Sequence, residues 1–222
     1  MIQRIAILLV VWSLWGSGRP AIASGDSTAH RDTSQQMQYL ILDSLRSEGT
    51  FRNGKRHGYW RWYYPTGRLF IDAYYVDGKK DGRVRVFYPD GTLKQLEHYR
   101  NGVKDGILRY YYPSGQLERE EYYEDGVLQD TAKYYYENGH LDMIIPYRNG
   151  KMHGLVRTFY PSGRIQSEEV FRNGVADSVS RFYAPDGTLR REVWFSNGTI
   201  LKVQDYQPKD SVETVRAGRR RK

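Results

Sequence analysis

A 24-residue pattern organises the chain: an aromatic residue, one spacer and an Asn-Gly or Asp-Gly pair recur at constant spacing. The anchoring aromatic residues are Phe51, Tyr75, Tyr99, Tyr123, Tyr147, Phe171 and Phe195. A fixed period of this size indicates a stacked array of repeats and not a single globular core. Function in such arrays usually lies on the long surface that the repeats build together.

Each repeat carries two turn signals, and short aromatic-rich runs lie between them. Asn-Gly and Asp-Gly are typical of type I′ hairpin turns, because both central residues need a positive φ. The second signal is Tyr-Pro-x-Gly, as in Tyr112-Pro113-Ser114-Gly115, where proline presets φ and glycine accepts the left-handed conformation. No stretch has sustained helical periodicity. The pattern predicts an all-β fold, an elongated antiparallel β-meander or solenoid of 24-residue two-stranded repeats.

The same pattern divides the chain into segments. Residues 24–36 are polar and predict a flexible lead-in, and residues 37–50 predict an N-terminal capping half-repeat. The repeat array then covers residues 51–206, and residues 207–222 predict a basic disordered tail. The predicted repeats are 51–74, 75–98, 99–122, 123–146, 147–170, 171–194 and a partial repeat 195–206.

Charged residues also recur at the repeat period. A basic column consists of Arg61, Arg85, Arg109, Lys133, Arg157 and Arg181. A less regular acidic column consists of Glu48, Asp72, Glu120, Glu168 and Glu192. Antiparallel pairing places such columns on neighbouring strands, so we predict cross-strand ion pairs. The alternative is a row of arginines that binds a ligand.

The N-terminus predicts an export signal. Arg4 precedes an apolar run of ten residues, 5–14, which is too short to cross a bilayer comfortably. Ala21-Ile22-Ala23 then offers a cleavage site, so residues 1–23 are a predicted signal peptide that is cleaved after Ala23. The mature protein would then be periplasmic, on the cell surface or secreted. An uncleaved membrane anchor is the alternative.

The formal net charge of +8 is concentrated at the two ends of the chain. Arg4 and Arg19 lie in the predicted signal peptide, and Arg216, Arg219, Arg220, Arg221 and Lys222 lie in the tail. Subtracting these seven charges from +8 leaves about +1, so we expect no nucleic-acid partner. A contact of Arg219, Arg220, Arg221 and Lys222 with an envelope glycan or an anionic membrane is one interpretation of the tail. A solvated end is the other.

No arrangement of residues predicts catalysis. The chain has no cysteine. His57 and His153 share a column but stand four repeats apart, too far to share one metal ion. The adjacent carboxylates Glu120-Glu121 and Glu168-Glu169 should point to opposite faces of a strand, which is wrong for acid–base partners. We therefore expect no catalytic residue, no metal site, no cofactor and no enzymatic activity.

The fourth repeat departs most from the pattern, and we place a predicted partner surface there. Asp130 replaces a glycine, as Ser178 does in the sixth repeat, and both repeats are expected to bend or pack differently. Pro146 cannot donate to a ladder and should lie at a strand end or bulge. Exposed apolar patches commonly mark interfaces. The predicted surface consists of Leu128, Met143, Ile144 and Ile145. Simple repeat decay, with Ile144 packed inward, is the alternative.

The repeat resembles a known family. The spacing G-x-x-x-G-x-W/V-x-x-Y-Y-P-x-G-x-L, with a closing E-x-x-Y-x-N-G, is similar to the MORN repeat variant over about residues 45–200. It is also similar to bacterial proteins of the YwqK antitoxin family. The first resemblance implies an extended β-hairpin array that acts in protein contacts and sometimes near membranes. The second implies neutralisation of a cognate toxin by binding.

The sequence alone therefore leaves three functions open. The first is a non-enzymatic exported platform that binds another protein of unknown identity. The second is a YwqK-like antitoxin or immunity protein, and the third is a module that binds an envelope glycan or a membrane surface. Trp60 and Trp62 are two residues apart and should share one face. Their burial would favour the platform, whereas a row of exposed tryptophans would favour sugars.

Overall fold

The computed structural model describes residues 36–42, for which only the backbone is considered, and residues 45–207. The predicted signal peptide, the lead-in up to residue 35 and the tail from residue 208 lie outside these ranges. The same holds for the predicted contacts of Arg219, Arg220, Arg221 and Lys222. In the described ranges, no helix is long and apolar enough to cross a membrane.

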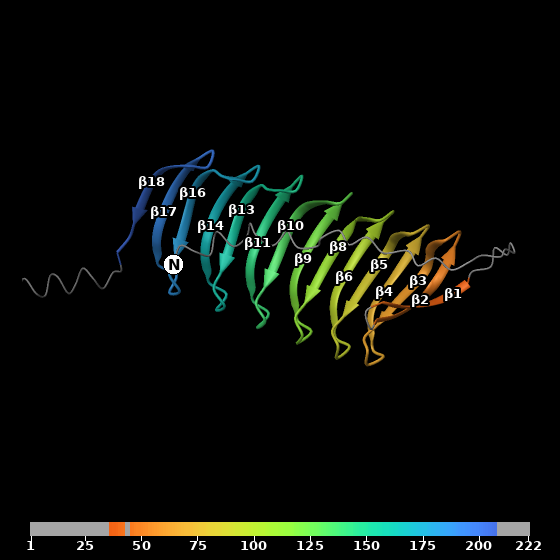
Figure 1. Cartoon of the computed structure of the whole chain (residues 1–222). Coiled ribbons are helices and arrows are strands. Elements are labelled where there is room, and N and C mark those ends of the chain that lie inside the picture. Colours follow the sequence, from red (N-terminus) through yellow and green to blue (C-terminus); the bar gives the residue numbers. More distant parts are fainter. Residues whose placement is uncertain (1–35, 43–44, 208–222) are drawn as a thin grey trace, which may run out of the picture. The chain divides into compact units, whose positions relative to one another are not determined.

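The described residues form one antiparallel sheet in which each strand lies beside its sequence neighbours, as Figure 1 shows. The all-β repeat fold is therefore confirmed. Three two-residue strands, β7, β12 and β15, are the first parts of strands that continue after a break as β8, β13 and β16. The strands of the described ranges are β1 (Gln36–Leu42), β2 (Leu45–Arg52), β3 (Lys55–Tyr63), β4 (Leu69–Val76), β5 (Lys79–Phe87), β6 (Leu93–Arg100), β7 (Val103–Lys104), β8 (Gly106–Tyr111), β9 (Leu117–Glu124), β10 (Val127–Tyr135), β11 (Leu141–Arg148), β12 (Lys151–Met152), β13 (Gly154–Phe159), β14 (Ile165–Arg172), β15 (Val175–Ala176), β16 (Ser178–Tyr183), β17 (Leu189–Ser196) and β18 (Thr199–Asp205).

Both turn signals form the predicted turns. Asn53 and Gly54 have φ of 52° and 69°, the two positive values that a type I′ turn requires. At the other end of a hairpin, the Gly115 amide donates to the Tyr112 carbonyl at 2.8 Å, and the Tyr112 amide donates to the Gln116 carbonyl at 2.8 Å. The fourth repeat makes the same turn without a proline, because its glycine still supplies the left-handed position.

The two glycine replacements keep the positive φ of this position. Asp130 has φ of 59° and Ser178 has φ of 73°, whereas the glycines at the equivalent position range from 78° at Gly58 to 119° at Gly154. A different bend or packing of repeats four and six stays a prediction. Both residues occupy a left-handed conformation that glycine adopts without strain, so each replacement costs free energy.

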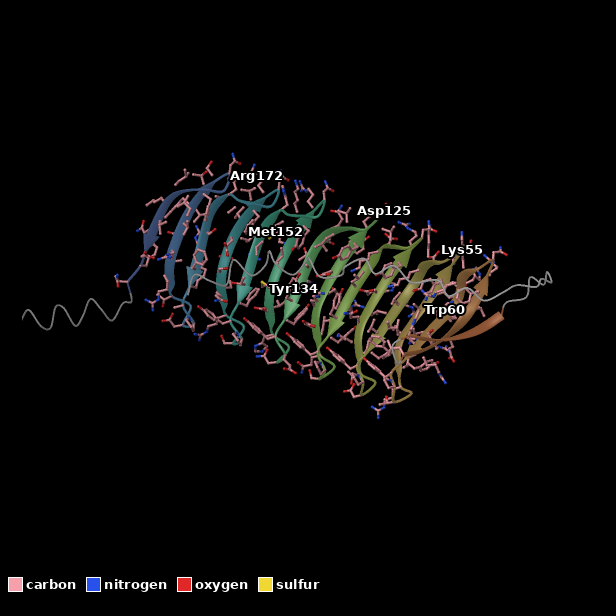
Figure 2. The ribbon with its side chains drawn as sticks, viewed as in Figure 1. Lys55, Trp60, Asp125, Tyr134, Met152 and Arg172 are labelled. Atoms are coloured by element: carbon pink, nitrogen blue, oxygen red, sulfur yellow. The ribbon has the colours of Figure 1, made fainter. Side chains whose placement is uncertain are left out.

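Side chains alternate between the two faces of the sheet, and one face holds the core. We call it the core face; Trp60, Leu108 and Ile145 are its largest fully buried side chains. The Trp60 ring, labelled in Figure 2, meets Phe51 edge-on at 4.8 Å between centroids and lies 5.9 Å from Trp62. Gly49 leaves room for this ring, because a Cβ at Gly49 would come within 2.3 Å of it.

Pro146 lies where the ladder is interrupted. On one side Pro146 pairs with Thr131 of β10. On the other side it faces the break between β12 and β13, where its carbonyl accepts a hydrogen bond from the His153 amide at 2.9 Å. The expected position at an irregularity is confirmed: the missing N–H of proline falls where the pairing is already broken.

Candidate binding surface

The second face, which we call the charged face, carries the predicted ion pairs. Arg109 Nε lies 2.7 Å from Glu120, Arg157 Nε lies 3.0 Å from Glu168, and Arg181 Nε lies 3.0 Å from Glu192. At the N-terminal end, Asp72 is buried and contacts both Arg61 and Arg85. The cross-strand ion-pair interpretation of the two columns is therefore confirmed. These arginines are half exposed, so each exposed pair contributes little stability.

A line of apolar residues runs beside these ion pairs on the charged face. It consists of cross-strand pairs, and we call it the apolar row: Tyr59–Tyr74, Ile107–Tyr122, Leu155–Val170 and Val179–Trp194. Arg83–His98 and Thr131–Pro146 interrupt it. Tyr59 is 63% exposed, and Ile107 and Tyr122 are exposed by 38% and 39%. The row thus presents large apolar side chains to solvent along the array.

A shallow hollow opens in the middle of the apolar row. Its volume is about 320 Å³, and it spans β8, β9 and β10. Ile107 and Tyr122 form its apolar wall, while Asp130, Thr131 and Lys133 form a polar wall. Asp130, Thr131 and Lys133 belong to the fourth repeat, in which Asp130 replaces a repeat glycine. The hollow therefore lies where the fourth repeat departs from the pattern.

Buried carboxylates on the core face are held by tyrosine hydroxyls. Glu97 accepts hydrogen bonds from Tyr99 at 3.0 Å and from Tyr110 at 3.2 Å. One repeat later, Glu121 accepts hydrogen bonds from Tyr123 and Tyr134, each at 3.3 Å. The adjacent carboxylate Glu120 points to the other face, which confirms the alternation predicted for this pair.

Burial and these carboxylates together raise the pKa of the tyrosines. Desolvation has the largest effect, and the negative charge of Glu121 adds to it, so the pKa of Tyr123 rises to about 12. The pKa values of Tyr99, Tyr110 and Tyr134 are raised in the same way. The hydroxyls therefore remain protonated donors well above neutral pH, which suits a fixed structural network.

The four residues of the predicted partner surface do not form one patch. Ile145 is 2% exposed and belongs to the core face, on which Met143 is half-buried. Ile144 is half-buried on the charged face opposite Lys133, and Leu128 lies near the turn. The expectation of a single exposed patch is wrong, because neighbouring residues of a strand face opposite ways. A partner contact of Leu128, Met143 or Ile144 stays a prediction.

His57 and His153 support turns. His57 Nδ1 lies 3.5 Å from the Asp77 amide, and His153 Nδ1 lies 3.4 Å from the Asn173 amide. Gln129 has the same role one repeat before His153, because its Oε1 accepts a hydrogen bond from the Asn149 amide at 2.8 Å. Over the described ranges, no group of three or more His, Cys, Asp or Glu side chains is placed to hold a metal ion.

The apolar row was not predicted from the sequence, although its signal is present there. Tyr59, Ile107 and Leu155 fill one column of the repeat, and Tyr74, Tyr122, Val170 and Trp194 fill another. Neither column is uniform, so neither stands out alone. Only the register, which pairs the two columns across neighbouring strands, shows that they form one line.

The 24-residue repeats match a known protein family. Five stretches match the family described as MORN repeat variant: residues 56–77, 80–101, 104–125, 131–149 and 152–173. These five stretches are MORN repeat variants. A comparison with curated proteins gives no match. The fourth stretch is shorter and begins directly after Asp130, the residue that replaces a repeat glycine. The antiparallel pairing continues beyond residue 173, because β16 and β17 pair as the earlier strands do.

Proposed function

We propose that this MORN repeat protein is a non-enzymatic, exported platform that binds another protein through its charged face. The apolar row is the observation that carries the proposal. It combines exposed aromatic and aliphatic side chains with a flanking line of ion pairs, and aromatic anchors beside a polar rim are typical of protein interfaces. Exposed apolar side chains grouped in this way commonly mark a place where another protein docks.

The tryptophans favour this platform over a sugar-binding module. Trp60 is fully buried, and Trp62 is half-buried against it on the core face. These side chains pack the first repeats and do not form an exposed row of stacking surfaces. A glycan would instead have to use the exposed tyrosines, of which Tyr59 already packs edge-on against Tyr74 at 5.0 Å.

A photo-crosslinking amino acid at Tyr122, introduced in intact cells, tests the platform. The matched control carries the same amino acid at Thr66, an exposed turn residue outside the row. We expect a discrete protein adduct from Tyr122 that is absent or much weaker from Thr66. Equal adducts from both positions, or an adduct with glycan or lipid alone, would contradict the proposal.

A YwqK-like antitoxin is the alternative kind of protein-binding function. The cellular location of the protein distinguishes the antitoxin from the exported platform. An exported platform whose signal peptide is cleaved after Ala23 should begin at Ser24. N-terminal sequencing of the protein from its native host checks this. A cytoplasmic product that begins at Met1 would instead favour an antitoxin that neutralises a cytoplasmic toxin.

A further inference from the structure

One column of the core face carries three glutamates. The carboxylates of two of them have both hydrogen-bond donors and a nearby cation. Glu97 has two tyrosine hydroxyls, and Lys104 Nζ lies 3.8 Å from it. Glu121 also has two tyrosine hydroxyls, and Arg119 lies 3.4 Å from it. The protein thus satisfies a carboxylate in this column with two hydroxyls and one cation.

The third glutamate of the column, Glu169, lacks all of these donors. Phe171 and Phe182 stand where Glu97 and Glu121 have tyrosines, Ala176 stands at the position of Lys104, and Ser167 at that of Arg119. Among the described residues, Glu169 has no ion pair, and its hydrogen bond comes from Ser167 Oγ at 3.1 Å. Burial raises the pKa of this carboxyl, and the Ser167 hydrogen bond offsets part of the rise.

A second polar group without a partner lies beside Glu169. Ser180 is fully buried, and its Oγ has no hydrogen-bond partner among the described residues. The register that pairs Ser167 with Phe182 and Glu168 with Arg181 places Ser180 across from Glu169 on the same face. Buried polar groups normally have partners, so two incompletely satisfied groups side by side point to a ligand.

The chemistry of this place fits a cation. A half-buried carboxylate with a free acceptor gains most from a charged donor. Aromatic rings attract cations over their faces, and Phe171 and Phe182 flank Glu169 along its own strand and on the next one. Arg191, on the core face opposite Phe182, is already paired with Asp205 at 2.6 Å. The array itself uses a lysine or an arginine at the two equivalent glutamates.

We propose that Glu169, Ser180, Phe171 and Phe182 form a slot on the core face that receives a lysine or arginine side chain of a partner protein. This inference rests on the proposed function and narrows it to a partner with an exposed basic side chain. The slot lies on the opposite face from the apolar row, so the two surfaces can be tested separately.

The test titrates the full chain with three pentapeptides that place lysine, arginine or norleucine between glycines. Binding is followed through the aromatic ring signals of Phe171 and Phe182 in nuclear magnetic resonance spectra. We expect saturable shifts with the lysine and arginine peptides and none with norleucine. Glu169→Gln should weaken binding about tenfold, because the charge-assisted hydrogen bond is lost. Glu124→Gln, at the exposed end of β9, should leave binding unchanged.

Two further variants supply the missing donors from within the chain. Ser167→Arg introduces the residue found at Arg119, and the double variant Phe171→Tyr/Phe182→Tyr restores the hydroxyls found around Glu121. Both should keep the fold, because neighbouring repeats already use these residues, and both should weaken peptide binding about tenfold. Equal shifts with norleucine, no shift with any peptide, or unchanged binding by Glu169→Gln would overturn the slot. The crosslink at Tyr122 would still decide the platform.

Discussion

The Tyr112 hydroxyl donates a hydrogen bond to the carbonyl oxygen of Tyr135, 2.7 Å away in the next repeat. Four equivalent bonds exist, from Tyr64 to Phe87, Tyr88 to Tyr111, Tyr136 to Phe159 and Tyr160 to Tyr183. Each joins the turn of one repeat to the aromatic column of the next. Since repeat arrays are stabilised by contacts between neighbours, these bonds hold the charged face in register along its length.

Tyr112→Phe should therefore destabilise the array. It removes the half-buried hydroxyl that donates to the Tyr135 carbonyl, and loss of this hydrogen bond costs about 1 kcal/mol of the free energy of unfolding. Chemical denaturation followed by circular dichroism measures the change. Tyr122→Phe, which removes an exposed hydroxyl, is the control and should have little effect. Equal losses in the two variants would argue against the inter-repeat bond.

Gly49→Ala should disrupt the N-terminal core. The new Cβ would lie 2.3 Å from the Trp60 ring, which is fully buried and cannot move without displacing Phe51. Overpacking of this kind costs about 1–3 kcal/mol. Thr66→Ala, in an exposed turn, serves as the control. The near-ultraviolet circular dichroism of the tryptophans and the denaturation midpoint report the effect, and an unchanged midpoint would show that the Trp60 packing is wrong.

The tyrosine network should make the protein sensitive to alkali. Burial and Glu121 raise the folded-state pKa of Tyr123 to about 12, above the value of about 10 in an unfolded chain. The stabilisation is then fully present below pH 10 and is lost as the pH rises through 12. An absorbance titration of tyrosinate should show a late-ionising group that shifts to lower pH in Glu121→Gln. A single early transition for all tyrosines would contradict the network.

The charge of Glu169 should destabilise the folded protein, whereas the charge of a paired carboxylate stabilises it. Its pKa is raised in the folded state, so the folded protein binds a proton more readily than the unfolded chain does. The destabilisation by Glu169 is therefore largest at neutral pH and is relieved as the pH falls through the raised pKa. Glu169→Gln should be more stable than the unaltered protein at neutral pH, with a difference that shrinks on acidification. Glu121→Gln should be destabilised at neutral pH, because it weakens the bonds to Tyr123 and Tyr134.

The fold could be predicted because its information is local and repeated. Asn53-Gly54 and its counterparts specify type I′ turns, and their constant spacing specifies the length of each strand. The basic and acidic columns could be placed together for the same reason. The binding surface could not, because it depends on which residues of two strands lie opposite each other. Ile144 and Ile145 are adjacent in sequence but lie on opposite faces, whereas Ile107 and Tyr122 are distant in sequence and adjacent in space.

The affinity of the crosslinked partner for variants of the apolar row tests the platform most directly. Ile107→Glu/Tyr122→Glu places two charges at the centre of the row, and Thr66→Glu places one at an exposed turn as control. If the row is the interface, the double variant should bind the purified partner at least about tenfold more weakly, while the control binds normally. Equal affinity of the double variant, the control and the unaltered protein would contradict a platform built on the charged face.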